Sequence, residues 1–243
     1  MNIILNGANG RMGRIVDEAV AQGGEHAVAA RVDWSYAAGD GLSELAQYEG
    51  PADVVIDFSN HAATAQVTEY CVERGLPVVI ATTGQTEEEL ALIRAAAQRI
   101  PVFLSANMSL GVALLADLAR RAAAAFPKAD IEIIERHHNQ KLDVPSGTAL
   151  LLARRIKEAR PEAEFLVGRH ENGKRTANEI GIHSLRYGGE VGTHEIIIAT
   201  GSETITLKHE AENRTLFAQG ALAAAAFIVG KAPGFYDMRS IIE

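Results

Sequence analysis

Cysteine, aromatic residues and basic charge are all scarce in this chain of 243 residues. A lone cysteine, Cys71, leaves no intrachain disulfide and no thiolate metal cluster, so we expect a small buried residue in a reducing compartment. Aromatic residues make up 5% of the chain, and 23 basic residues face 31 acidic ones, for a net charge of −8. Such a chain has no long-range attraction to nucleic acid or to an anionic membrane. Any anionic ligand must therefore be bound by groups within its own binding site.

Long hydrophobic runs are also missing. No segment has the roughly 18 uninterrupted apolar residues of a membrane helix, and the first ten residues, MNIILNGANG, lack the features of a signal peptide. We therefore expect no membrane partner and a cytoplasmic location. The composition, 47% hydrophobic and 22% charged, is typical of a globular protein, and the length allows one large α/β domain or two smaller ones.

The first 107 residues alternate short apolar runs with amphipathic stretches. The runs are almost continuously apolar, which favours parallel strands buried on both faces, at 3–5, 27–32, 53–57, 77–81 and 102–105. A helix is predicted at 11–22, with a left-handed stop at Gly23-Gly24, and Thr86 with Glu89 predicts a capping box on another. This alternation predicts an α/β fold with a Rossmann-like, doubly wound parallel sheet.

The pattern changes after Ser109. The elements predicted there are a helix at 110–125, a strand at 131–135, a helix opened by Ser146 and stopped near Pro161, and an alanine-rich helix at 215–230. Residues 178–210 alternate polar and apolar side chains, which favours antiparallel strands with one open face. Two domains fit this change best, the second of them α+β.

The segment GANGRMG, Gly7 to Gly13, follows a predicted strand and opens a predicted helix. Gly7 allows a tight turn, Gly10 lets backbone approach a pyrophosphate, and Gly13 allows close packing of helix on strand. Glycine is also common in a plain strand-to-helix turn, so the spacing alone is weak. Asp33 lies 20 positions beyond Gly13 at the end of the second strand, where a carboxylate can bind ribose hydroxyls. Together they predict dinucleotide binding, although a solvated carboxylate remains the alternative for Asp33.

Asp33 also bears on the choice of cofactor. A carboxylate there repels a 2′-phosphate, and the position after it holds Trp34 instead of a compensating arginine. We therefore predict that NADH is preferred, with Arg31 a poorly placed residue for accepting NADPH instead.

Small and hydroxyl residues follow two further strands, in ATTG (81–84) and SANMS (105–109). Ligands of open α/β sheets bind at the carboxyl ends of strands, and small residues there would let a flat nicotinamide approach. Ordinary turn and capping chemistry is the alternative explanation.

The densest polar cluster is ERHHNQKLDVPSGT, residues 135–148. His137, His138 and Lys141 supply proton donors, and Ser146 can cap a helix whose first N–H groups would hold a carboxylate. A solvated loop and a metal site are the alternatives. Metal is disfavoured because the cluster has no HExxH pattern and no cysteine, and because Lys141 repels a cation; we predict no metal.

The chain resembles the bacterial dihydrodipicolinate reductase family over essentially its whole length. The motifs that carry the resemblance are, in order, GANGRMG, DVVIDFSNH, ATTG, SANMSLGV, ERHHNQKLDVPSGTA and HEAENRTLFAQGA. The resemblance implies NAD(P)H-dependent reduction of 4-hydroxy-tetrahydrodipicolinate, a dicarboxylate, to tetrahydrodipicolinate in diaminopimelate and lysine biosynthesis. It also implies a dinucleotide domain (1–107 with 214–243) and a substrate-binding domain (108–213) whose open mixed or antiparallel sheet forms a homotetramer.

The same resemblance assigns roles to individual residues. His137 and Lys141 match proton donors, His138 a substrate contact, and Gly147 and Thr148 the backbone site for a substrate carboxylate. The matched cofactor contacts are Gly7, Ala8, Asn9, Gly10, Arg11, Met12, Asp33, Ala81, Thr82, Thr83, Ser105, Ala106, Asn107 and Met108. Trp34 departs from the family, because many members have arginine there.

The residue types fit this chemistry even apart from the family resemblance. A conjugated cyclic imine accepts hydride only where a cationic or proton-donating group stabilises the electrons that arrive, and His137 or Lys141 can do so. Two other functions stay open at this point: a Rossmann reductase of an amino or keto acid, and a non-catalytic dinucleotide sensor. A sensor would have no use for the histidine pair and the lysine beside a carboxylate-binding helix start.

Overall fold

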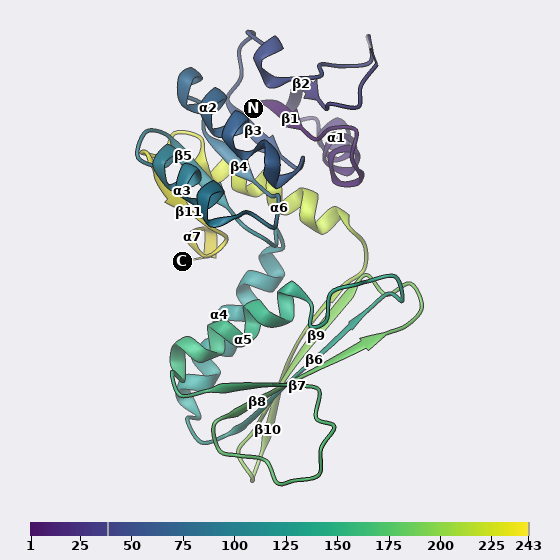
Figure 1. The fold of residues 1–243 in the computed structure, drawn as a ribbon, viewed down its shortest axis with the longest axis vertical. Coiled ribbons are helices and arrows are strands. Elements are labelled where there is room, and N and C mark those ends of the chain that lie inside the picture. Colours follow the sequence, from purple (N-terminus) through teal and green to yellow (C-terminus); the bar gives the residue numbers. More distant parts are fainter. Residues whose placement is uncertain (38, 243) are drawn as a thin grey trace. The chain divides into compact units, whose positions relative to one another are not determined.

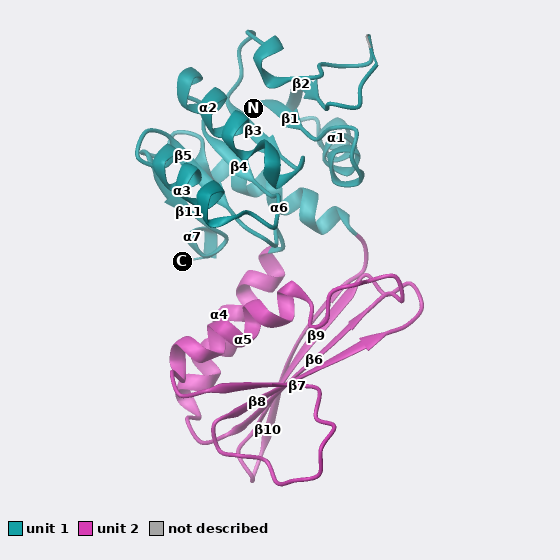
Figure 2. Ribbon diagram, viewed as in Figure 1, with its two compact units in different colours: residues 1–109, 214–243 teal, residues 110–213 magenta. Residues whose placement is uncertain are grey.

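The computed structural model describes residues 1–37 and 39–242. The chain divides into two compact units (Figure 2): unit 1 comprises Met1–Ser109 and Arg214–Glu243, and unit 2 comprises Leu110–Asn213. Within the described residues, no helix combines the length and the apolar character needed to cross a membrane.

Unit 1 is built on a sheet of six parallel strands. In spatial order the strands are β11 (Gly234–Tyr236), β5 (Pro101–Leu104), β4 (Val78–Ile80), β3 (Val54–Asp57), β1 (Asn2–Asn6) and β2 (Ala27–Val32). All residues of β3 and β4 are buried, as the continuous apolar runs predict for strands covered on both faces. The predicted Rossmann-like, doubly wound sheet is therefore confirmed.

The helices of unit 1 come from both ends of the chain (Figure 1). They are α1 (Arg11–Gly23), α2 (Thr64–Arg74), α3 (Glu87–Ala96), α6 (Thr215–Ile228) and α7 (Arg239–Ile242), with short 3₁₀ turns η1 (Leu45–Gln47) and η2 (His61–Ala63). Helix α6 contacts α1 and three central strands, so the C-terminal segment completes the layer on one side of this sheet. Helices α2 and α3 contact each other.

Local signals set several of these boundaries. Gly24, at φ +69°, ends α1, and the Thr86–Glu89 capping box opens α3 as predicted. Strand β11 was not predicted. It has three residues and a half-exposed Phe235, so it lacks the long apolar run that marks the other strands.

Unit 2 packs two helices on one face of a five-stranded sheet. The strands, in spatial order, are β10 (Thr204–Ala211), β9 (Gly192–Ala199), β6 (Asp130–His137), β8 (Glu179–Arg186) and β7 (Glu164–Val167), and the helices are α4 (Leu110–Ala125) and α5 (Gly147–Ala159). Apolar residues of β6, β8, β9 and both helices form its core. The second domain is thus α+β, as predicted.

The expected antiparallel pairing in 178–210 holds for β9 and β10, whereas β8 pairs with β6 instead of with β9. Strand β6 separates β8 from β9 and runs parallel to β8 and antiparallel to β9, so the sheet is mixed. Alternation of polar and apolar residues shows that a strand has one open face, but it carries no information about strand direction. Strand β7, a short edge strand with largely exposed residues, was not predicted.

Candidate active site

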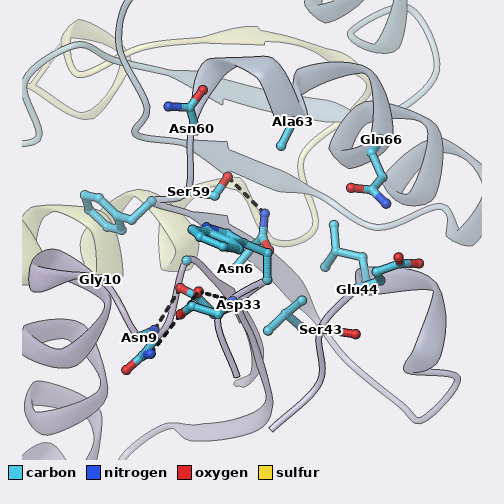
Figure 3. Close-up of a pocket in the computed structure, with 16 residues that line it drawn as sticks. Asn6, Asn9, Gly10, Asp33, Ser43, Glu44, Ser59, Asn60, Ala63 and Gln66 are labelled. Carbon is cyan, nitrogen blue, oxygen red and sulfur yellow. Dashed lines mark hydrogen bonds between the residues drawn. The ribbon is translucent and has the colours of Figure 1, made fainter. Parts of the chain in front are cut away.

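The carboxyl ends of β1, β2 and β3 border a cleft of about 370 Å³ in unit 1 (Figure 3). Ligands of open parallel sheets bind at this edge. The residues that line the cleft are Asn6, Gly7, Asn9, Gly10, Val32, Asp33, Trp34, Ser35, Ser43, Glu44, Leu45, Phe58, Ser59, Asn60, Ala63 and Gln66.

Close backbone packing shapes the turn between β1 and α1. Gly7 has φ +78°, and a Cβ there would lie 2.6 Å from the backbone of Phe58, while a Cβ on Gly13 would lie 2.1 Å from the Gly7 carbonyl oxygen. Gly10 is the N-cap of α1 and has no side chain to satisfy the helix N–H groups. The positive end of the helix therefore stays available to an anion beside the cleft. The other predicted turn residues are Asn9 in the cleft lining, Ala8 buried, Met12 partly buried and Arg11 exposed.

Asp33 lies in the cleft with its carboxylate fixed by neighbouring donors (Figure 3). The Asn9 N–H donates to Oδ2 at 3.1 Å, and the Ser35 N–H and hydroxyl donate to Oδ1 at 3.0 and 2.6 Å. Asp33 keeps 8% of its surface exposed. The carboxylate predicted to bind ribose hydroxyls is thus held at the edge of the glycine turn.

The cleft lining around Asp33 carries acidic but no basic side chains among the described residues. Trp34 lines the cleft and is 87% exposed, and Arg31 makes a bidentate pair with Asp17 at 2.9 and 2.6 Å. Among the described residues that line the cleft none is lysine or arginine, whereas Asp33 and Glu44 are acids. Arg31 is therefore engaged elsewhere.

A buried carboxylate that the sequence analysis did not single out lies behind the cleft. Asp57 ends β3 and accepts hydrogen bonds from Asn6 Nδ2 at 2.8 Å and from the Ser59 hydroxyl and N–H at 2.5 and 3.1 Å. Burial raises the pKa of Asp57 above its ordinary value, and these neutral donors offset that only in part. Asp57 thereby fixes the loops after β1 and β3, both of which line the cleft.

The two predicted small-residue loops follow β4 and β5, at the same edge of the sheet. The Ala81 N–H donates to the Asp57 carbonyl at 2.9 Å, and the Ser105 N–H donates to the Ile80 carbonyl at 3.2 Å. These loops extend the edge beyond the cleft but do not line it. The residues concerned are Ala81, Thr82, Thr83, Ser105, Ala106, Asn107 and Met108.

In unit 2, a fully buried carboxylate organises the predicted histidine cluster. Glu135 Oε2 lies 2.5 Å from Nδ1 of His137, and Arg186 donates to both carboxylate oxygens at 2.9 and 2.8 Å. Burial alone would raise the pKa of Glu135, but the hydrogen bonds from His137 and Arg186 outweigh it and hold the pKa far below its ordinary value. Glu135 is therefore ionised, and its charge is compensated by Arg186.

A second buried histidine completes this cluster. The ring of His194 meets that of His137 edge to face, with centroids 5.2 Å apart, and its Nε2 lies 3.2 Å from the Ser146 hydroxyl. The same hydroxyl accepts the Ala149 N–H at 3.1 Å and so caps α5, as predicted. Burial first, and then the nearby His137, lower the pKa of His194 to about 3, so His194 is neutral near pH 7.

The predicted carboxylate site already contacts a carboxylate of this chain. Lys141 Nζ lies 2.7 Å from Asp143 Oδ1, and the Gly147 N–H also bonds to Asp143. Burial raises the pKa of Asp143, but Lys141 outweighs this effect and the net shift is downward. His138 and Thr148 are partly buried, His138 next to His137 on the chain and Thr148 in the first turn of α5.

Sequence reasoning missed Glu135, Arg186 and His194 as members of the cluster. A signal for Glu135 was present, because it falls on the same face of its strand as the core residues Ile131 and Ile133. A charged residue at a core position requires a partner, but nothing local indicates Arg186, 51 residues away. Among the described residues, no three histidine, cysteine or acidic side chains are grouped to hold a metal ion.

Models of one known protein family match both units of the chain. The family model described as dihydrodipicolinate reductase, N-terminus, matches residues 1–108, and the model described as dihydrodipicolinate reductase, C-terminus, matches residues 111–242. The chain belongs to the dihydrodipicolinate reductase family. Its N-terminal domain is a dinucleotide-binding fold, which supports the use of NAD(P)H.

Curated relatives of this reductase family match over their full length. A 4-hydroxy-tetrahydrodipicolinate reductase of Caldanaerobacter subterraneus subsp. tengcongensis is 44% identical, covering 100% of this chain and 98% of the relative. One from Caulobacter vibrioides is 43% identical, covering 100% and 97%.

Among solved structures, a dipicolinate-bound dihydrodipicolinate reductase from Paenisporosarcina sp. TG-14 superposes with a TM-score of 0.77 at 28% identity, covering 98% of this chain and 97% of the other. A diaminopimelate dehydrogenase from C. glutamicum, solved with its diaminopimelate ligand, has a TM-score of 0.61 at 13% identity, covering 98% and 93%. The second likeness concerns the fold alone.

The low pKa of His194 predicts how the stability of this reductase depends on pH. The native state resists protonation down to about pH 3, whereas the unfolded state takes up a proton near the ordinary value of 6.5. The free energy of unfolding therefore falls as pH drops below 6.5, and His194 accounts for about 2 kcal/mol of the loss between about pH 7 and pH 5. Urea unfolding of His194→Gln should show a correspondingly smaller loss.

The matched control for this experiment is His170→Gln, because His170 is exposed on a loop. Its unfolding curves should shift with pH as those of the wild type do. Equal pH dependence in His194→Gln and the wild type would contradict the prediction.

Proposed function

We propose that this chain reduces 4-hydroxy-tetrahydrodipicolinate to tetrahydrodipicolinate with NAD(P)H, a step of diaminopimelate and lysine biosynthesis in the cytoplasm. The observation that carries the proposal is membership of one reductase family across both units of the chain. The relatives that match over their full length share one activity in their names.

The cleft of unit 1 suits a dinucleotide. The helix start at Gly10 can accept the pyrophosphate, and the carboxylate of Asp33 can accept hydrogen bonds from ribose hydroxyls. We assign the loops 81–83 and 105–108, along the same edge, to the nicotinamide half. The nicotinamide, when bound, supplies the hydride.

We infer that NADH is the preferred cofactor. A 2′-phosphate would enter a region that contains Asp33 and Glu44, and among the described residues of the cleft lining there is no cation to offset them. Arg31 is paired with Asp17, which argues against its use as a phosphate ligand.

We assign the two proton-donating roles to His137 and Lys141. Hydride addition to a conjugated imine requires a group that stabilises the arriving electrons by donating a proton or by carrying positive charge. Both side chains act electrostatically on His194, so they belong to one cluster. Substitution of either should slow the chemical step.

We assign the substrate carboxylates to His138, Lys141 and the N–H groups of Gly147 and Thr148. Support comes from Asp143, whose carboxylate already binds Lys141 and the Gly147 N–H. Lys141 and the Gly147 N–H therefore have the geometry to hold a carboxylate, and the substrate would replace that of Asp143. A related reductase structure is described as dipicolinate-bound, a dicarboxylate of similar chemistry.

We further propose a homotetramer formed through the open face of the unit 2 sheet. The face opposite α4 and α5 carries partly exposed Ile134 and Ile197 and an exposed Leu185 among charged side chains. Apolar residues in such a setting are typical of a surface that packs against a second sheet.

The activity is tested with aspartate semialdehyde, pyruvate and the preceding synthase, which together generate the substrate. NADH absorbance should fall when this chain is added and should not fall when the synthase is omitted.

The wild type should show a higher kcat/KM for NADH than for NADPH. Trp34→Arg should raise kcat/KM for NADPH about tenfold by supplying a charged hydrogen bond to the 2′-phosphate.

Trp34→Gln is the matched control, because it removes the indole without adding charge. It should not improve the use of NADPH. A strong NADPH preference of the wild type would overturn the cofactor assignment, and an inactive wild type would overturn the function.

Substitutions in unit 2 should separate chemistry from binding. His137→Gln and Lys141→Ala should lower kcat by about 10²-fold or more, the usual contribution of a general acid. Thr148→Ala should raise KM for the substrate by about tenfold and change kcat little, because one binding contact is weakened. Steady-state kinetics measure both effects, and wild-type turnover in His137→Gln would refute the role of that residue.

The oligomeric state is measured by sedimentation equilibrium. The wild type should have four times the chain mass of 26.0 kDa. Ile134→Lys, which places a charge on the open sheet face, should reduce that mass. Leu92→Lys, on an exposed position of α3, should not; a wild-type monomer would contradict the proposal.

A further inference from the structure

Glu135 connects the predicted proton donor with the start of the helix assigned to the substrate carboxylate. Glu135 and His137 are two positions apart on β6, so both side chains project from the same face of the sheet. One carboxylate oxygen, Oε2, bonds to the His137 ring, and the other, Oε1, accepts the Ser146 N–H at 3.1 Å. Ser146 in turn caps α5.

The position of this carboxylate is fixed by Arg186. Its guanidinium contacts both oxygens of Glu135 and also donates to the Asp143 carbonyl at 2.7 Å. A two-point pair of this kind restricts rotation of the carboxylate as well as compensating its charge. Glu135 therefore has little freedom to release His137.

The charge of Glu135 decides which nitrogen of His137 holds its proton most firmly. An ionised carboxylate can only accept a hydrogen bond, so Nδ1 of His137 must carry the hydrogen. The other nitrogen, Nε2, lies near Gly192, where a Cβ would come within 3.0 Å of it. The absence of a side chain at Gly192 leaves space beside Nε2.

We propose that Glu135 is a positioning residue for the reduction. It holds the ring of His137 and the start of α5 in one arrangement and keeps Nδ1 protonated, so that Nε2 is the nitrogen that donates the proton. This inference rests on the function proposed above and adds a residue to its mechanism.

The proton step then has a defined course. The substrate must first lose its hydroxyl as water, which leaves the conjugated imine. As a ring carbon of that imine takes up the hydride released from the C–H bond of a bound nicotinamide, the Nε2–H bond of the His137 imidazolium breaks, and its proton bonds to the ring atom that has gained electron density. The electron pair of that bond remains on Nε2. The ring becomes neutral, with Nδ1–H still donated to Glu135, and solvent returns the proton to Nε2.

Other titratable groups surround this pair. Arg186 contacts Glu135 from β8, His194 faces His137 from β9, and His209 and Lys141 act on His194. His194 is neutral near pH 7 and therefore adds no charge beside His137. The negative group in direct contact with His137 is Glu135.

Glu135→Gln tests the inference. It should lower kcat by about 10²-fold with little change in KM for NADH. Glu132→Gln is the matched control on the same strand, since Glu132 also pairs with an arginine and a histidine, Arg175 and His183. It should retain wild-type kcat.

Glu135→Gln leaves Arg186 without a full negative partner and could unfold the protein. The double variant Glu135→Leu with Arg186→Met replaces the buried pair by apolar side chains of similar size, a change that folded proteins often tolerate. It should fold and show the same loss of kcat. Nitrogen-15 NMR of the wild type gives a readout that needs no variant: neutral His137 should carry its proton on Nδ1.

The outcomes are distinct. Wild-type turnover in either folded variant, or a neutral wild-type His137 protonated on Nε2, would overturn the role of Glu135. If that happened while His137→Gln remained impaired, the proposed function would stand. An inactive wild type would instead remove the function itself.

Discussion

The buried carboxylate of Glu135 is the interaction on which the unit 2 site depends. A charge without exposed surface is stable only where donors surround it, and here the donors come from β6, β8 and the start of α5. Three elements are therefore tied to one side chain. Displacing any of them would remove one of the donors that compensate the buried charge, so the arrangement with all three in place is favoured.

In unit 1 a buried acid, Asp57, also joins separate segments, but its pKa shifts in the opposite direction from that of Glu135. Asp57 joins the loops after β1 and β3 through neutral donors, Asn6 and Ser59, and its pKa is raised. Glu135 is paired with the cation Arg186, and its pKa is lowered. Burial acts in the same direction on both carboxyls, so the hydrogen-bond donors decide the sign. Those from His137 and Arg186 outweigh burial at Glu135, whereas the neutral donors at Asp57 do not.

The sequence was most informative where structure is set locally. Helix 110–125, the Thr86 capping box and the Ser146 cap follow from residues within one or two turns, and the continuous apolar runs predict buried parallel strands. Strand direction in unit 2 and the Glu135–Arg186 pair depend on segments that are distant in sequence and meet only in the folded chain. The periodicity of apolar residues shows which face of a strand is buried, but it does not show which strand or side chain lies next to it.

The net charge of −8 constrains how this chain can bind two anions. Several of its cations are already matched within the fold, Arg31 by Asp17, Arg186 by Glu135 and Lys141 by Asp143. If the substrate binds as proposed, its carboxylate exchanges with that of Asp143, whose half-exposed side chain can return to water. The exchange brings no additional uncompensated charge against Lys141, whereas a 2′-phosphate would add one beside Asp33. Under the proposed function, the same acidic background would accept a dicarboxylate and discriminate against NADPH.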